Sequence, residues 1–77
     1  MSIQVDQELD ARGLSCPLPI LKAKKALAAM SSGQILRVTA TDTSSMQDFQ
    51  AFAKQTGNEI IEQYTQADEF ITVLRRR

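Results

Sequence analysis

The only cysteine of this chain, Cys16, lies in a segment rich in residues that form turns and start helices. The segment reads Leu9-Asp10-Ala11-Arg12-Gly13-Leu14-Ser15-Cys16-Pro17-Leu18-Pro19. A lone cysteine in a small domain is most often a buried apolar side chain. Here the flanking prolines and the polar neighbours favour an exposed thiol at the entrance of a helix. We therefore expect the function of this chain to depend on the chemistry of its one thiol.

The position of Cys16 directly before Pro17 predicts a capping residue at a helix N-terminus. A residue before proline favours the extended angles that an N-cap needs, and proline is tolerated in the first helical turn. The free N–H groups and partial positive charge of a helix start stabilise a thiolate, so we expect a lowered pKa for Cys16. Pro17 and Pro19 have no N–H, so only the N–H of Leu18 is left to reach the sulfur. Leu18 also precedes a proline, so the alternative is a helix that begins at Pro19 and leaves Cys16 just outside.

One accessible thiol is sufficient for a protein that carries sulfur. Its thiolate attacks the outer sulfur of a partner's persulfide, becomes Cys–S–SH and passes that sulfur to another thiol. Each step resembles thiol–disulfide exchange, in which the thiolate fraction and access govern the rate. The chain has no histidine, which excludes a Cys–His dyad, a Ser-His-Asp triad and a Cys/His zinc finger. We expect no metal and no cofactor.

The composition indicates a small, neutral, globular protein. The chain has 77 residues, with 9 Lys+Arg against 9 Asp+Glu, and we expect one domain over residues 1–77. Zero net charge argues against a general nucleic-acid binder, and we expect no direct nucleic-acid partner. One cysteine cannot form an internal disulfide, which favours a reducing compartment. The polar start lacks the pattern of a signal peptide and no stretch is long enough to span a bilayer, so we expect a cytoplasmic monomer without membrane contact.

The first half of the chain predicts a strand, a helix and a second strand. Residues 4–10 alternate in hydrophobicity and predict a short strand. Residues 17–30 predict a helix that ends near Gly33, a left-handed stop. Its apolar stripe consists of Ile20, Ala23, Leu27 and Met30. Residues 35–40 are rich in β-branched side chains and predict a strand in which alternate residues face opposite sides.

The second half predicts another helix and a pair of strands. The helix covers residues 45–56 and stops at Gly57. Its buried stripe consists of Met46, Phe49, Phe52 and Ala53, and its start offers capping residues at Ser44, Ser45 and Asp48. Residues 58–64 and 69–75 predict two strands joined by a turn. The order β-α-β-α-β-β predicts an α/β (α+β) two-layer sandwich, with a four-stranded mixed sheet, two helices on one face and a more exposed opposite face.

Residues 9–19 resemble the signature of the TusA/SirA-like sulfur-carrier family, a Leu-Asp…Gly…Cys-Pro-x-Pro segment that opens the first helix. The resemblance implies a sulfurtransferase that carries a persulfide on Cys16. The other residues that match the family's loop and helix entrance are Asp10, Gly13, Pro17 and Pro19. It also implies a donor such as a cysteine desulfurase or rhodanese and a thiol-bearing acceptor protein. The pathways it suggests are tRNA thiolation, molybdenum-cofactor supply or sulfur oxidation.

Several basic residues near the motif have two readings. Arg12, Lys22 and Lys25 form either an electropositive collar that docks partners or an ordinary solvated face. Lys24 lies nearer the apolar stripe and is expected to extend its ammonium group to solvent. The arginines of residues 75–77 are expected to form a frayed, solubilising end.

Two other functions compete with sulfur carriage. A small α/β sandwich with an open sheet face can bind RNA or protein there, although this chain offers few aromatic side chains for base stacking. A redox-sensing thiol is the other alternative, although the chain has no second cysteine to resolve an oxidised one.

Overall fold

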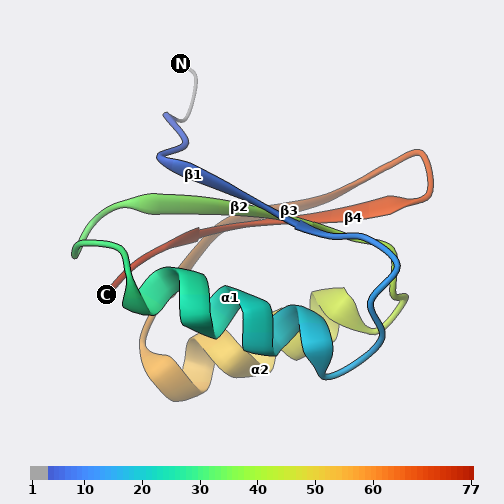
Figure 1. Ribbon diagram of the computed structural model, residues 1–77, viewed down its shortest axis with the longest axis horizontal. Coiled ribbons are helices and arrows are strands. Elements are labelled where there is room, and N and C mark those ends of the chain that lie inside the picture. Colours follow the sequence, from blue (N-terminus) through green and yellow to red (C-terminus); the bar gives the residue numbers. More distant parts are fainter. Residues whose placement is uncertain (1–3) are drawn as a thin grey trace.

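The computed structural model describes residues 4–77, and its elements follow one another in the expected order β-α-β-α-β-β (Figure 1). They are β1 (Gln7–Ala11), α1 (Leu18–Ala28), β2 (Ile35–Ala40), α2 (Ser45–Thr56), β3 (Glu59–Gln66) and β4 (Glu69–Arg75). The sheet order is β1-β2-β4-β3, in which β1 and β2 are parallel and β4 is antiparallel to both neighbours. Both helices cover the same face of the sheet (Figure 1). The predicted two-layer fold with a mixed sheet is confirmed.

The core lies between the sheet and the two helices. On β2, Leu36, Val38 and Ala40 are buried while the residues between them are only partly covered, which confirms the predicted alternation. Helix α2 inserts Phe49, whose side chain is 0% exposed, and Phe52, whose ring meets that of Phe49 edge-on at 6.2 Å between centroids. The apolar stripes predicted for the two helices therefore form the core, although Ile20 and Met46 are only partly buried.

Strand β1 begins later and ends later than predicted, at Gln7 and Ala11 rather than at residues 4 and 10. Its partner strand β2 sets these limits, because Gln7 pairs with Leu36 and Ala11 pairs with Ala40. Before Gln7, the N–H of Asp6 donates to Ile35 O at 2.9 Å, and the carboxylate of Asp6 accepts the N–H of Ile35 at 2.8 Å.

Helix α1 is shorter than predicted at both ends. It begins at Leu18, and Pro17 is its N-cap, so Cys16 lies one residue before the cap and is not the capping residue itself. At the other end, the N–H of Met30 bonds to Leu27 O three residues back at 3.0 Å, which closes the helix with a tighter turn. Gly33 has the predicted positive φ of 88°, but it belongs to the turn before β2 instead of stopping α1. Helix α2 and its left-handed end at Gly57 agree with the prediction.

Strand β3 contains an irregularity that the sequence pattern does not reveal. The pairing with β4 shifts between Ile60 and Glu62, so alternation is interrupted and Gln63 lies on the helix side opposite Thr72. The Gln63 amide donates to Met46 O at 2.9 Å and to Thr72 Oγ1 at 3.1 Å, which ties the start of α2 to the sheet. Pairing also continues to Gln66, so the turn is confined to two residues and β3 is longer than predicted.

The face of the sheet away from the helices is less open than predicted at its centre. Ile71 and Val73 of β4 lie on this face, yet they are only 4% and 1% exposed. Their sheet neighbours include Arg37, opposite Val73, and Tyr64, opposite Ile71. Arg37 is itself paired with Glu8 at 2.8 Å. Among residues 4–77, the aromatic ring on this face is that of Tyr64, and Arg37 on the same face is paired with an acidic residue.

Candidate functional site

Cys16 is exposed in the loop that joins β1 to α1. Because β1 and β2 are parallel, the loops that follow them leave the sheet at the same edge, and the second loop anchors the first. Thr41 Oγ1 accepts the N–H of Gly13 at 2.9 Å, and Asp42 Oδ2 accepts the N–H of Cys16 at 2.8 Å. Gly13 adopts a φ of 78°, which glycine tolerates and other residues rarely adopt. The cysteine backbone is therefore fixed by side chains from the opposite half of the chain.

Three polar residues at the start of α2 form a cluster beside the cysteine, which we call the Asp42–Ser44–Asp48 cluster. Ser44 Oγ lies 2.9 Å from Asp42 Oδ2 and 3.1 Å from Asp48 Oδ2. Ser44 was expected only as a helix cap, but it makes no side-chain cap to the backbone of α2. Asp42 and Asp48 are partly buried. The charged groups that act on the pKa of the Cys16 thiol are the carboxylates of Asp48 and Asp42.

The prediction of a lowered pKa for Cys16 is wrong, since its pKa is raised above the ordinary value. The largest cause is a hydrogen bond between the thiol and the Asp48 carboxylate, followed by loss of solvent around the sulfur and by the charges of Asp48 and Asp42. The Ser44 hydroxyl acts in the opposite direction. Helix α1 helps the thiolate less than expected, because Cys16 is not its N-cap and the N–H of Leu18 bonds to Ser15 O at 2.8 Å.

This electrostatic setting gives a direct expectation for alkylation of the free thiol. Because the thiolate is the reactive form, the rate constant of wild-type protein with iodoacetamide should have its midpoint above about pH 8.5, the value of an ordinary cysteine. The measurement is the alkylation rate between pH 6 and pH 10, with a short unstructured cysteine peptide as reference. A midpoint below that of the peptide would contradict the acidic setting described here.

Two of the predicted basic residues, Arg12 and Lys22, make contacts with Asp10 and Glu69. The guanidinium group of Arg12 pairs with Asp10 at 2.9 Å and with Glu69 at 3.4 Å. The hydrogen bonds from Arg12 hold the pKa of Asp10 at about 2. Lys22 directs its ammonium group to the carbonyl oxygen of Asp10 at 3.3 Å, and Lys25 lies in the last turn of α1. Asp10 therefore stabilises its own loop through its contacts with Arg12 and Lys22.

The prolines and two leucines shape the surface at the start of α1. Pro17 is the N-cap, while Pro19 is buried against the core, so each proline has a structural role. Leu18 and Leu21 are 45% and 53% exposed, and both are large apolar side chains close to Cys16 in the chain. They were missed by the sequence reading, although their three-residue spacing beside the buried stripe is the signal of an apolar helix face.

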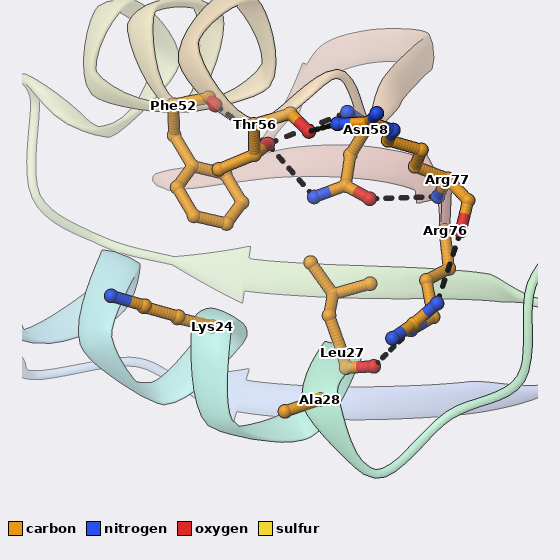
Figure 2. Close-up of a pocket in the computed structure, with 8 residues that line it drawn as sticks. All are labelled: Lys24, Leu27, Ala28, Phe52, Thr56, Asn58, Arg76 and Arg77. Atoms are coloured by element: carbon orange, nitrogen blue, oxygen red, sulfur yellow. Dashed lines mark hydrogen bonds between the residues drawn. The ribbon is translucent and has the colours of Figure 1, made fainter.

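A hollow of about 330 Å³ lies elsewhere, where α1 and α2 end near the last residues of the chain (Figure 2). Arg76 directs its Nε to Leu27 O at 2.6 Å, and Arg77 directs Nη1 to Thr56 O at 3.3 Å. The Arg77 N–H also donates to Asn58 Oδ1 at 2.8 Å. The terminal arginines are thus held in place and not frayed as predicted, because Arg76 and Arg77 donate to carbonyl groups near the C-terminal ends of the two helices.

Replacing Arg76 by alanine is expected to destabilise the fold by about 1–2 kcal/mol, since a charge-assisted hydrogen bond to a partly buried carbonyl is lost. Urea unfolding followed by circular dichroism measures the change. The matched control is Arg75→Ala, which removes only an exposed ion pair with Glu59 and should cost less than about 1 kcal/mol. Equal losses in both variants would contradict the capping role of Arg76.

Within residues 4–77, no helix is both long enough and apolar enough to cross a membrane. The fold and the site together define a small two-layer α/β protein that presents one anchored cysteine at the edge of its sheet. That description matches known proteins over nearly the whole chain.

The family model described as Sulfurtransferase TusA matches residues 7–76. The sulfur carrier protein TusA of Allochromatium vinosum is 61% identical over 71 residues, which cover 92% of this chain and 93% of that protein. A putative sulfur carrier protein of Neisseria meningitidis serogroup A is 46% identical over 92% of this chain and 96% of its own. The crystal structure of a SirA-like protein from Desulfitobacterium hafniense has a TM-score of 0.78 at 28% identity, covering 90% of this chain and 95% of that one. The chain belongs to the TusA sulfurtransferase family.

Proposed function

We propose that this protein carries sulfur as a persulfide on Cys16. The observation that carries the proposal is the placement of the chain's one thiol, which is exposed while its backbone is anchored by Asp42. Relatives named sulfur carrier proteins support this role. A thiol that must react with two successive partner proteins needs access and a fixed position, and both are present in this loop.

In the proposed step the Cys16 sulfur attacks the outer sulfur of a donor persulfide. A bond forms between these two sulfur atoms, and the bond between the donor's two sulfur atoms breaks. The donor leaves as a thiol, and Cys16 becomes Cys16–S–SH, so one thiol and one persulfide are consumed and one of each is produced. Delivery to the acceptor repeats the exchange in the other direction. The protein thus acts as a stoichiometric relay within a sulfurtransferase system.

The partners we propose are a cysteine desulfurase or rhodanese as donor and a thiol-bearing acceptor protein. The acceptor belongs to tRNA thiolation, molybdenum-cofactor supply or sulfur oxidation, and the relay operates in the cytoplasm as one carrier domain. Exposed Leu18 and Leu21 offer apolar contact beside the thiol, with Arg12, Lys22 and Lys25 as further candidates for docking. Asp10, Gly13, Pro17 and Pro19 act by shaping the loop and the helix start.

The test is to load the reduced protein with a cysteine desulfurase and cysteine, and to measure its intact mass without reductant. A gain of about 32 daltons that reductant removes is expected, as for an exchanging thiol. If neither this donor nor rhodanese with thiosulfate produces the gain, the proposal is contradicted. Salt-sensitive binding of RNA by the same preparation would then favour the alternative in which the open face of the sheet binds RNA.

A further inference from the structure

The hollow where α1 and α2 end is lined by three basic side chains, those of Lys24, Arg76 and Arg77. Lys24 lies on one side of it, and the two arginines lie on the other (Figure 2). Within residues 4–77, no acidic side chain lines this hollow. Counting the carboxyl group of Arg77 as an anion still leaves more positive than negative charge here. The electrostatic potential in the hollow is therefore positive, which favours a bound anion.

Arg76 and Arg77 are fixed at the hollow mainly by hydrogen bonds to backbone oxygen atoms. Arg76 donates from Nε to Leu27 O at 2.6 Å and from Nη1 to Arg77 O at 3.0 Å. Arg77 donates from Nη1 to Thr56 O at 3.3 Å, and its N–H donates to Asn58 Oδ1 at 2.8 Å. A guanidinium group has five N–H donors, so both arginines keep donors at Nη2 that these hydrogen bonds do not use. Because the groups are already held in position, less entropy is lost when they bind an anion.

Lys24 adds a charge that the capping of helix ends does not explain. It is exposed, and among the described residues its ammonium group has no ion pair. Two further lysines, Lys25 and Lys54, lie in the last turns of α1 and α2. Glu59, at the start of β3, is paired with Arg75. The surroundings of the hollow thus reinforce its positive charge and do not neutralise it.

The inner wall of the hollow is apolar. Leu27 and Phe52 line it and are 4% and 7% exposed, and Ala28 adds a methyl group beside them. The volume of about 330 Å³ lies at the lower end of the roughly 300–1,000 Å³ that is usual for ligand pockets. A ligand that joins an anionic group to a small apolar part therefore matches both the charge and the wall.

We propose that this hollow binds a small phosphate monoester, a function separate from sulfur carriage. The phosphate group lies between Lys24 and the two arginines, and the apolar part lies against Leu27 and Phe52. A phosphate monoester carries about 1.5 to 2 negative charges at pH 7 and three strong acceptor oxygens, which suits a set of three cations better than a singly charged carboxylate does. The guanidinium groups of Arg76 and Arg77 bind such oxygens through paired N–H groups, and Lys24 acts as a point charge.

The test is an NMR titration of nitrogen-15-labelled wild-type protein with phenyl phosphate at pH 7.5 and about 0.15 M salt, where surface charges are strongly screened. The backbone amide signals of Leu27, Ala28 and Asn58 should shift and reach saturation. Those of Ser15 and Cys16, in the loop before α1, should not. Inorganic phosphate lacks the apolar ring, and phenol lacks the charge. Each should bind at least about threefold more weakly than phenyl phosphate, because each keeps only part of the match.

Lys24→Gln removes one cation and keeps an exposed polar side chain, so phenyl phosphate should bind about threefold more weakly or worse. The matched control is Lys54→Gln, the same change at a lysine that does not line the hollow, and it should alter the affinity less than about twofold. Arg77→Gln is a second test and should weaken binding by about threefold or more. Arg76 is kept, because its loss is expected to destabilise the fold. Thermal melting checks that each variant is folded.

Three results overturn the inference. The first is the absence of saturable shifts at the hollow up to about 10 mM phenyl phosphate. The second is equal weakening in Lys24→Gln and Lys54→Gln, which would indicate a general attraction to positive surface. The third is a short single-stranded RNA that shifts the same amides at lower concentration than phenyl phosphate, which would assign the surface to nucleic acid. Cys16→Ser should bind phenyl phosphate as wild type does, so failure of the proposed sulfur carriage leaves this test intact.

Discussion

Cys16→Ser should abolish sulfur loading completely and leave the fold intact. Serine keeps the backbone N–H that bonds to Asp42, but its hydroxyl oxygen cannot form a persulfide. The side chain is exposed, so the substitution should change the free energy of unfolding by less than about 0.5 kcal/mol. The measurements are intact mass after treatment with a loaded desulfurase and urea unfolding of both proteins.

The matched control for this loss is Ser15→Ala, which alters an exposed neighbour and keeps the thiol. It should load sulfur as wild type does. A mass gain that persists in Cys16→Ser would place the sulfur on another group and contradict the proposed role. A variant that no longer folds would indicate that Cys16 has a structural role.

Phe49→Ala should destabilise the protein by about 3–5 kcal/mol, the usual cost of removing a fully buried phenylalanine. Phe49 is 0% exposed, belongs to the core cluster and meets Phe52 edge-on. A small domain has only about 5–15 kcal/mol of stability, so this loss removes a large share. Urea unfolding followed by circular dichroism gives the free energy, provided that the variant is still folded in the absence of urea.

Leu21→Ala is the control for Phe49→Ala, because it truncates a side chain that is 53% exposed. It should cost less than about 1 kcal/mol, and sulfur loading then shows separately whether Leu21 serves a partner. A cost below about 1 kcal/mol for Phe49→Ala would show that the core collapses around the missing ring, against the packing described here.

Most of the fold could be predicted from local patterns. The β2 alternation and the buried stripe of α2 depend on side-chain periodicity, which is visible in the sequence. The ends of β1 could not be predicted because they are fixed by pairing with β2. The irregularity in β3 was equally hidden, since nothing in the residues around Ile60 marks where the register with β4 shifts.

The exposure of Cys16 and its place before a helix agree with the prediction, whereas the predicted direction of its pKa shift was wrong. The prolines and glycine around Cys16 indicate a loop before a helix, and the exposed thiol lies there. The lowered pKa was expected from the nearest helix alone. Asp42 and Asp48 lie far along the chain, and only the parallel pairing of β1 with β2 brings them to the thiol. Their spacing in the sequence is also that of ordinary helix-capping residues, which concealed a second role.

The anchoring of Cys16 by a residue 26 positions away makes the acidity of this thiol a property of the assembled fold. A peptide that contained only residues 9–21 would keep the whole sequence motif and lose the carboxylates of Asp42 and Asp48. Its thiol would ionise as an ordinary cysteine does. In the intact protein, local opening of the first turn of α2 would have the same effect for as long as it lasted. The pKa of Cys16 therefore reports whether the β1–α1 loop is packed against the start of α2.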